Sequence, residues 1–505
     1  MLRFILRRLG ASAAILLGAS LLLYVLMVNA GDPLKDLRES NASNRDELIR
    51  QRIGFMGLDQ PWYQRYWTWL AGVAKCVTLN CDLGTNRSGV EVSSLLANAA
   101  GSTLRLVVLA TVLAAVLGIA VGVLTAVRQY SGLDYSVTFL TFLFFSLPVF
   151  WAAVLLKEYL AIGYNDWIAN PAFTPAQTAV SALLFGFVMQ VVLAGSRTRR
   201  LATFAASAAF VALVLPYLQW LNFFRYPQLG FGGVVVLSLA VALSATATSA
   251  GLRNKLVLYP VLATVLAGAI AYWATFGLME NPTWGTLALL LAAAVAVPVV
   301  LGRVLGGHLR GRATGAGLAT ALAMAGLTTL DHIFRAWPGF LSLKPRPIST
   351  IGSQTPNFGG TFWESFLDRG AQLLLPTLLL ALISLASYSR YTRASMLEVG
   401  RQDYIRTARA KGLGERTVIL KHALRNALIP IATIMAFDFA GLIGGAVVTE
   451  AVFGWKGMGE LFRTGLDQVD PAPVMAFFLV TGTAAVLFNM LADILYAILD
   501  PRIRV

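Results

Sequence analysis

The chain has 505 residues, of which 57% are hydrophobic and only 13% are charged, and its mean hydropathy is +0.69. A soluble domain is about 45–50% apolar and about 25% charged, so this composition excludes a soluble globular enzyme, a disordered protein and a disulfide scaffold. The net charge of +15 is typical of nucleic-acid-binding proteins, but those proteins carry their charge on a wet surface that this chain lacks. The composition indicates a polytopic membrane protein that binds no nucleic acid.

Apolar runs of about 20 residues, long enough to cross a bilayer core of about 30 Å as a helix, recur along the whole chain. Membrane β-strands are excluded because they alternate apolar and polar residues over about ten positions. The pattern therefore predicts an all-α polytopic membrane protein. Its twelve predicted spans are 9–29, 103–127, 135–156, 176–195, 201–221, 231–250, 256–278, 285–302, 313–332, 373–394, 428–450 and 474–499.

The distribution of basic residues predicts the orientation. The first apolar run follows three arginines and ends at Val28-Asn29-Ala30, which loosely resembles a signal-peptidase site. The run is longer than the 7–15 residues of a signal h-region, which favours an uncleaved anchor. With the N-terminus inside and twelve spans, the inside segments hold 23 of the 40 Lys and Arg. Because cytoplasmic loops are enriched in Lys and Arg, both termini are predicted to be cytoplasmic.

Two large segments are predicted to lie outside the membrane on the far side. Residues 31–101 are mixed and charged, with an aromatic run from Trp62 to Trp69 that is suited to the membrane interface. Residues 336–371 are rich in Pro, Gly and Ser, which predicts a loop. Cys76 and Cys81 lie on this oxidising side, so we expect a disulfide, with two free thiols as the alternative. No histidine accompanies them, which argues against a metal site.

The cytoplasmic segment 395–427 has a pattern of its own. Asp403 to Lys411 is predicted to be helical, with Gly412 and Gly414 stopping the helix, and a second helix at about 415–427 returns the chain to the membrane. Its basic face suits headgroups or an acidic partner. A small apolar knob is formed by Tyr404, Ile405, Ala408 and Leu413. The pattern fits a helix that docks in another subunit's groove, or a solvated interfacial amphipathic helix.

The same segment carries a family resemblance. Arg406-Thr407-Ala408-Arg409-Ala410-Lys411-Gly412 resembles the E-A-A-x-x-x-G loop of ABC-importer permeases, in the R-T-A-x-A-K-G form of the peptide/nickel permeases. Further blocks match in order: Met1–Leu9, Gly31-Asp32-Pro33, Gly57–Pro61, Asp82–Thr85, Ser146–Trp151, His422–Pro430 and Asp493–Arg502. The chain most resembles the B-type permease subunit of dipeptide/oligopeptide ABC importers.

The resemblance covers about 1–157 and 370–505, and it has two departures. Lys456 stands where the family's outer re-entrant segment usually has proline. Residues 158–335 add six spans between the family's third and fourth helices, and an even number preserves the sidedness of both flanks. The resemblance thus implies a type I ABC-importer permease core of six helices plus six additional ones. The implied parts are 1–30 (first helix), 31–101 (outer loop region), 102–157 (core helices 2–3), 158–335 (inserted block), 336–371 (outer loop) and 372–505 (core helices 4–6 with the coupling loop 395–427).

The resemblance also implies partners in a bacterial inner membrane. These are a second permease subunit, two cytoplasmic ATPase subunits that bind ATP and Mg, and an external peptide-binding protein. The chain itself has no G-x-x-x-x-G-K-[ST] phosphate loop, so we expect no bound nucleotide, cofactor or metal and no catalytic residue. The residues implied to couple to the ATPases are Asp403, Tyr404, Ile405, Arg406, Thr407, Ala408, Ala410, Lys411, Gly412 and Leu413.

Two residues within the spans are candidates for the translocation path. Asp438 lies mid-span, where a carboxyl is costly, and it either meets a peptide's amino group or hydrogen-bonds to the partner permease. Pro148 is expected to kink its span rather than touch substrate. A single-chain secondary transporter and a membrane-embedded transferase are the competing functions, but the halves do not resemble each other and no loop is rich in Asp, His and Arg. Dipeptide, oligopeptide, glutathione-like peptide and nickel complex all remain open as substrate.

Overall fold

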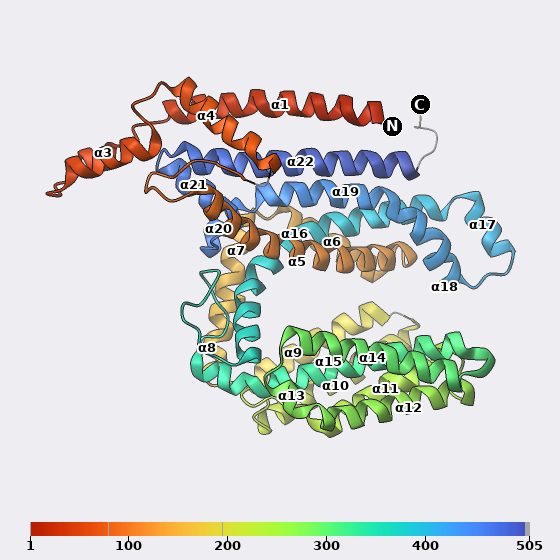
Figure 1. The fold of residues 1–505 in the computed structure, drawn as a ribbon. Helices are drawn as coiled ribbons and strands as arrows, with labels where there is room; N and C mark the ends of the chain where they lie inside the picture. Colours follow the sequence, from red (N-terminus) through yellow and green to blue (C-terminus); the bar gives the residue numbers. More distant parts are fainter. Residues whose placement is uncertain (1, 79, 194, 500–505) are drawn as a thin grey trace. The chain divides into compact units, whose positions relative to one another are not determined.

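The computed structural model describes residues 2–78, 80–193 and 195–499, and these form helices with no strand among them (Figure 1). The predicted tail Asp500-Pro501-Arg502 lies outside this range. The chain divides into two compact units, unit 1 with residues 1–160, 350–353 and 372–505, and unit 2 with residues 161–349 and 354–371. Helices suit a bilayer because they satisfy their backbone N–H and C=O groups internally.

Unit 1 contains five long helices, and α22 packs against α1, α5 and α19. Its helices are α1 (Leu2–Asn29), α2 (Lys35–Arg38), α3 (Arg45–Met56), α4 (Trp62–Ala74), the 3-10 turn η1 (Lys75–Thr78), α5 (Val92–Val127), α6 (Gly132–Ser146), α7 (Val149–Leu155), α16 (Phe362–Gly400, from residue 372), α17 (Asp403–Ala410), α18 (Glu415–Thr417), the π-helix η4 (Val418–Ala423), α19 (Leu424–Gly445), α20 (Val447–Phe453), α21 (Met458–Asp467) and α22 (Pro471–Leu499). The π-helix η2 (Leu156–Ile162) crosses the boundary between the units.

Unit 2 contains a four-helix bundle of α11, α12, α14 and α15 and a hairpin of α9 and α10 that pack chiefly on each other. Its helices are α8 (Gly163–Ala169), α9 (Pro175–Leu193), α10 (Arg197–Trp220), α11 (Gly230–Ser249), α12 (Lys255–Ala274), α13 (Phe276–Glu280), α14 (Trp284–Leu305), the 3-10 turn η3 (Gly307–Leu309), α15 (Arg310–Leu343) and the first turns of α16. The bundle core contains Val234, Val257, Val261 and Met324.

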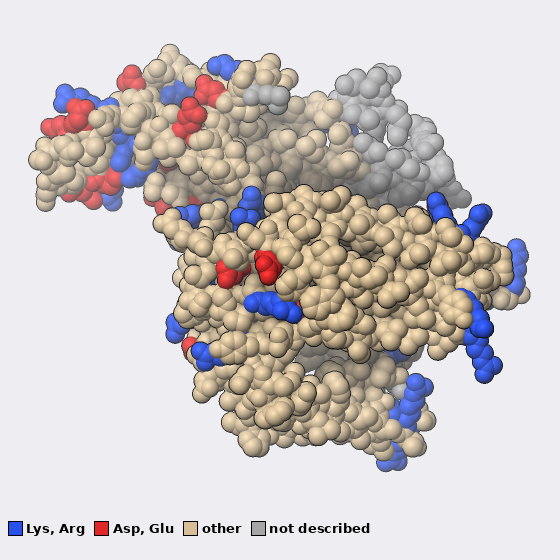
Figure 2. All heavy atoms as spheres, turned by 60° about the horizontal axis from the view of Figure 1, so that its bottom comes forward, with Lys and Arg blue, Asp and Glu red and all other residues tan. Residues whose placement is uncertain are grey.

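Among the described residues, eleven helices are long and apolar enough to cross a membrane, or twelve if one bent pair counts as a span. A helix occupies every apolar run predicted from the sequence, so the expectation of an all-α polytopic membrane protein is confirmed. The charged side chains agree with this architecture. Most of the face shown in Figure 2 carries neither sign, and blue Lys and Arg stand mainly toward its margins.

The predicted span 135–156 is wrong as one continuous helix. It breaks at Leu147-Pro148, and the helices on either side, Gly132–Ser146 and Val149–Ala169, are bent by 109°. Proline lacks the N–H that would continue the ladder, and it pushes the preceding residue out of the helical region. Leu147 is accordingly extended, at φ −77° and ψ 127°. The expected kink at Pro148 is thus present, as a sharp break in the span.

Two further boundaries differ from the prediction. The span predicted at 428–450 ends at Gly445, and its last residues belong to the separate helix α20. The loop predicted at 336–371 is shorter, because α15 continues to Leu343 and α16 begins at Phe362. The helix contains Pro338, and Phe340 just after it is fully buried. The start of α16 is a capping arrangement in which Glu364 accepts a hydrogen bond from the Thr361 N–H.

The segment predicted to lie at the membrane interface is partly packed into unit 1. Tyr66 and Trp69 of α4 are buried against Tyr24 and Met475, whereas Trp62, Tyr63 and Trp67 are exposed. Just after α4, Cys76 and Cys81 form a disulfide, with 4.1 Å between their Cα atoms. The aromatic run therefore has two faces, one that attaches α4 to α1 and α22 and one that remains free.

Charged side chains hold the remainder of this segment together. Asp36 accepts hydrogen bonds from Arg52 and Arg87, and the Arg87 N–H donates to Asp470 at 2.7 Å, just before α22. Partial burial of Asp36 opposes its ionisation, but the hydrogen bond from Arg52 and the charges of both arginines outweigh it and hold the pKa of this carboxyl below its usual value. The segment is thereby tied to the membrane helices at more than one point.

Glu450 anchors the broken end of α19 and α20 to α5. Its fully buried carboxylate accepts hydrogen bonds from the Thr103 hydroxyl at 2.6 Å, the Gly459 N–H at 2.7 Å and the Glu460 N–H at 3.3 Å. The Thr103 oxygen in turn accepts from the Met458 N–H at 2.8 Å. One carboxylate thus supplies acceptors to the start of α21, whose first N–H groups have no partner within the helix.

Glu450→Gln should therefore lower the thermal midpoint of the protein by several degrees. The amide keeps one acceptor oxygen but brings an N–H₂ group toward backbone donors, and a buried unsatisfied donor costs about 1–3 kcal/mol. Glu39→Gln, which removes the same charge at an exposed position of unit 1, is the matched control and should leave the midpoint unchanged. Equal midpoints for both variants would contradict the anchoring role.

Candidate functional site

The loop between α16 and α19 contains α17, which corresponds to the segment singled out in the sequence. α17 has Asp403 in its first turn and Arg409 in its last, which matches the sign of the helix dipole at each end. Gly412 follows in the left-handed conformation, at φ +74°, and its N–H donates to the Arg409 carbonyl at 2.9 Å. The Leu413 N–H donates to the Ala408 carbonyl at 3.3 Å. Glycine is favoured at such a helix end because a side chain is strained there.

One face of α17 packs on its own chain. Ile405 is fully buried and Ala408 is 7% exposed, and both belong to an apolar cluster with Met396 of α16 and Val418 and Ala427 beyond the turn. The predicted four-residue apolar knob is therefore divided. Two of its members hold the helix to the ends of α16 and α19. The side chains left at the surface are those of Asp403, Tyr404, Arg406, Thr407, Ala410, Lys411 and Leu413.

Polar contacts fix the turn after α17. Arg409 makes a two-pronged ion pair with Glu415, at 2.7 and 3.1 Å, across the loop that holds Gly412. Asn426 of α19 donates to the Tyr404 hydroxyl at 2.8 Å. A bidentate pair restricts orientation as well as distance, so α17 is attached both by apolar packing and by charge.

The second helix predicted at about 415–427 is not a separate element. α18 has three residues and leads through the π-helix η4 directly into α19. The sequence offered apolar spacing there but no stop signal, and the extra residue of the π-helix rotates the side chains that follow it. As a result, α17 sits on a stiff helical continuation of a membrane helix.

A buried ion pair near this loop was missed by the sequence analysis. Arg393 of α16 donates both Nε and Nη2 to the carboxylate of Asp134, each at 2.8 Å, and Asp134 is 4% exposed as a side chain. Asp134 lies in the first turn of α6, which the Ser131 side chain caps. The signal in the sequence was the Ser-x-x-Asp cap, but its arginine partner lies 259 positions away.

Asp438 is hydrogen-bonded within the chain. Its carboxylate accepts from the Ser384 hydroxyl at 2.7 Å and from the Tyr388 hydroxyl at 2.6 Å, and both donors lie on α16. The carboxylate thus links α19 to α16, and its predicted contact with a peptide's amino group or with the second permease stays a prediction. The two donors lie one turn apart on α16, so Asp438 clamps two adjacent turns of that helix.

Lys157 of η2 is a further polar residue that the sequence analysis missed. Its Nζ donates to the Val452 carbonyl at 3.1 Å and lies 5.8 Å from the centre of the Phe453 ring. Residue 157 follows directly on the predicted span, and nothing in its neighbours marked it. It joins the helix after the Pro148 break to the end of α20.

Comparison with known protein families shows to which family the chain belongs. A model described as "binding-protein-dependent transport system inner membrane component" matches residues 118–505, which is more than half of the chain. A model of the N-terminal part of such components matches residues 1–84. The chain belongs to this family. The family is one of inner membrane transport components, which agrees with the helical architecture and with a multi-pass location in the inner membrane.

Individual relatives match shorter stretches more closely. The chain is 49% identical over 154 residues to the oligopeptide transport system permease protein OppB of Mycobacterium tuberculosis, and 44% identical over 140 residues to the dipeptide transport system permease protein DppB of Escherichia coli. These matches cover 47% and 41% of those proteins, so the chain spans about half the length of these curated relatives. It is 27% identical over 507 residues to AppB, an oligopeptide transport system permease protein of Bacillus subtilis, with both chains fully covered.

The turn after α17 provides a prediction from backbone geometry. A side chain at Gly412 meets no atom within 4 Å, so Gly412→Ala adds no clash and only the left-handed strain, about 1–2 kcal/mol. Amide exchange in residues 403–413 should rise roughly 5–30-fold. Gly414→Ala is the matched control, because Gly414 also has open space but lies at φ −59°, and it should leave exchange unchanged.

The bonding of Asp438 provides a second prediction. Asp438→Asn keeps an oxygen that can accept from both hydroxyls, so the thermal midpoint should stay close to that of the parent protein. Asp438→Leu leaves the Ser384 and Tyr388 hydroxyls without that acceptor and should destabilise the protein by about 1–3 kcal/mol. If Asp438→Asn lowered the thermal midpoint as much as Asp438→Leu, the negative charge of Asp438 would itself stabilise the protein.

Proposed function

We propose that the chain is the transmembrane permease subunit of an ATP-driven ABC importer for dipeptides or oligopeptides. Membership of the binding-protein-dependent transport family and the names of the relatives, which are permease proteins of oligopeptide and dipeptide transport systems, support this function. The observation that carries the proposal is α17. It is fixed to its own membrane helices by Ile405 and Ala408 and leaves a row of polar and apolar side chains free on the other face.

In this proposal the free face of α17 docks on a cytoplasmic ATPase subunit. Tyr404 and Leu413 are 42% and 41% exposed and supply apolar contacts, while Asp403, Arg406 and Lys411 supply charges. Because Ile405 and Ala408 of α17 pack on the helical stretch that runs from α18 through η4 into α19, a displacement of α17 moves a helix of the membrane unit. ATP binding and hydrolysis take place in the partner subunits, and the coupled movement alternates access to the path. Such coupling requires different contacts in the two states.

The orientation is part of the same proposal. Lys and Arg lie at α17, at the start of α10, between α11 and α12 and around η3, at segments that alternation across the spans puts on one side. That side is the cytoplasm by the rule that positive loops stay inside. A second permease subunit completes the path, and an external binding protein delivers the peptide. In this arrangement the chain contributes half of the pathway and no catalytic residue.

Leu413→Asp tests the docking face. The side chain is exposed, so we expect normal insertion, while peptide uptake by the reconstituted importer falls at least tenfold and ATP hydrolysis no longer responds to loaded binding protein. Leu252→Asp is the matched control, since Leu252 is 50% exposed in the turn between α11 and α12, and it should leave uptake unchanged. Gly412→Asp should act like Leu413→Asp.

Two results would overturn the proposal. One is substrate-stimulated ATP hydrolysis of normal size in both Leu413→Asp and Gly412→Asp importers. The other is peptide transport by the purified chain alone in liposomes, driven by a proton gradient and insensitive to vanadate, which would instead identify a secondary transporter. Co-purification of the chain with ATPase subunits from native membranes provides an independent measurement.

A further inference from the structure

Unit 2 contains a cavity that the proposed transport function does not use. It lies between α12, α14 and α15, and the first turns of α16 close one end of it. Its volume is about 760 Å³, within the range of about 300–1,000 Å³ that ligand pockets occupy. The three helices around it are each long and apolar enough to cross the membrane. The cavity is therefore at the depth of the lipid hydrocarbon.

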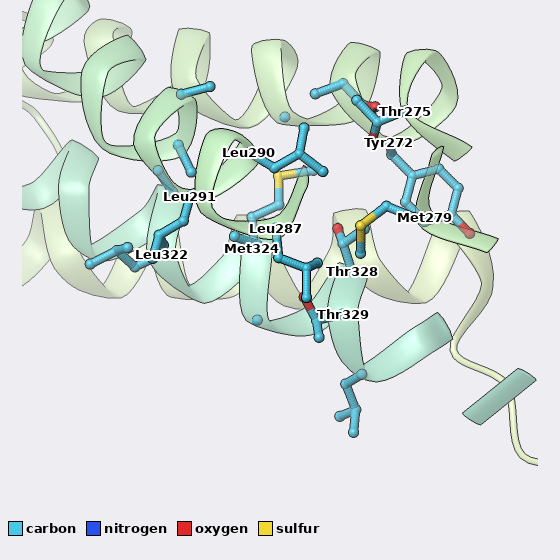
Figure 3. A pocket seen from close by; sticks show the side chains of 18 of the residues that line it. Tyr272, Thr275, Met279, Leu287, Leu290, Leu291, Leu322, Met324, Thr328 and Thr329 are labelled. Carbon is cyan, nitrogen blue, oxygen red and sulfur yellow. Dashed lines mark hydrogen bonds between the residues drawn. The ribbon is translucent and has the colours of Figure 1, made fainter. Parts of the chain in front are cut away.

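The lining of this cavity is almost wholly apolar. Leu287, Leu290 and Leu291 come from α14, Leu322 and Met324 from α15, and small residues such as Gly268, Ala294 and Gly326 leave the space between them (Figure 3). Leu291 and Leu322 are 53% and 45% exposed, so the cavity is open at its side as well as hollow between the helices. An apolar occupant would restore the dispersion contacts that its walls lack.

Water is a poor occupant because the lining offers few polar side chains, namely Thr264, Tyr272, Thr275, Thr328 and Thr329 besides the two tryptophans, and three of these hydroxyls donate elsewhere. The hydroxyls of Thr264 and Thr275 donate to carbonyls of their own helix, of Pro260 and Ala271, each at 2.8 Å. The Tyr272 hydroxyl donates to Asp331 at 2.8 Å, so the ring and not the hydroxyl faces the cavity. A buried water needs two to four polar partners, and the few hydroxyls of this lining are too sparse to supply them for the waters that a space of this size would hold.

A transmembrane helix of a partner is too large for the space. A helix about 10 Å wide that crosses about 30 Å of hydrocarbon occupies on the order of 2,400 Å³, roughly three times the cavity volume. A slender, flexible chain of methylene groups fits this shape. The occupant favoured by size and polarity is an acyl chain.

The end of the cavity at the start of α16 has the composition of a membrane interface. Trp284 and Trp363 line it, and the Trp363 indole N–H donates to the Met279 carbonyl at 2.6 Å. Trp side chains prefer the headgroup level of a bilayer. Exposed charges of both signs lie beside this end in the sequence, Glu280 following Met279 and Arg369 following Phe366 by one turn. Neither positive nor negative charge dominates at this end of the cavity. It can therefore accommodate the headgroup of a phospholipid without selecting the headgroup's charge.

We infer that the cavity between α12, α14 and α15 binds one acyl chain of a membrane phospholipid, which enters from the end marked by Trp284 and Trp363. The bound chain fills the space between the helices of the bundle and is part of the packed structure of unit 2. The cavity shares no residue with the free face of α17, and the test of lipid binding does not require peptide transport.

The test uses the full chain in bacterial membranes. Cells that express it are grown on a fatty acid with a terminal diazirine, which they incorporate into phospholipids. After illumination the crosslinked peptides are mapped by mass spectrometry. The labelled peptides should come from the cavity lining of α14 and α15, and the added mass should be that of a phospholipid. Label should be at least tenfold denser per residue there than on α10, which has no buried residue.

Two pairs of variants make the test specific. Ala294→Phe fills the cavity and should reduce the label at least tenfold, whereas Ala296→Phe, two residues away on the exposed surface of α14, should not. Gly326→Leu should also reduce it, whereas Gly315→Leu should not; both glycines lie on α15 with open space at the Cβ position, so both variants should fold. Label as dense on α10 as in the cavity, undiminished label in both filling variants, or a crosslink to a protein or its lipid anchor would overturn the inference.

Discussion

Hydrocarbon supplies no hydrogen-bond partner, and this constraint governs where unit 1 can depart from straight helices. Each break there is accompanied by a polar side chain from elsewhere in the chain. After Pro148, Lys157 donates to the last turn of α20. Beyond Gly445, Glu450 accepts from the start of α21 and from Thr103 of α5. Polar side chains of an apolar chain thus serve at interruptions of the backbone, whereas others, such as Asp438, join intact helices.

α17 is attached in a different way, because it lies beyond the ends of the membrane spans. Ile405 and Ala408 give it an apolar base, and the Arg409–Glu415 pair limits its rotation. The two attachments act on opposite parts of the helix, one below it and one at its C-terminal end. The helix is therefore placed to move as a body with α16 and α19, so that a push on its free face is not lost in local bending.

The positions of the spans were predictable because hydropathy is a local property, and the helix at 403–410 was predictable from its stop signal at Gly412. The partners of the polar residues were not. Asp438 pairs with Ser384 and Tyr388, and Asp134 with Arg393, across separations that no local pattern encodes. The bend angle at Pro148 could not be predicted either. A proline shows that the helical hydrogen bonds are interrupted, but it does not show by how much the helix axis turns. Composition likewise overestimated the length of the loop before α16, because α15 continues through Pro338 to Leu343, where the buried Phe340 packs.

The helix α10 has no buried residue among its 24 positions. Outside the contacts that Phe204 and Ala208 make with Gly186 of α9, packing therefore places little demand on which apolar residue stands at each position. Such a segment can exchange Leu, Val, Phe and Ala freely over evolutionary time while its structure stays the same. Its sequence would lose all trace of common ancestry sooner than the clamped helices α16 and α19, and kinship in the inserted block is better sought in the order and length of its helices than in their residues.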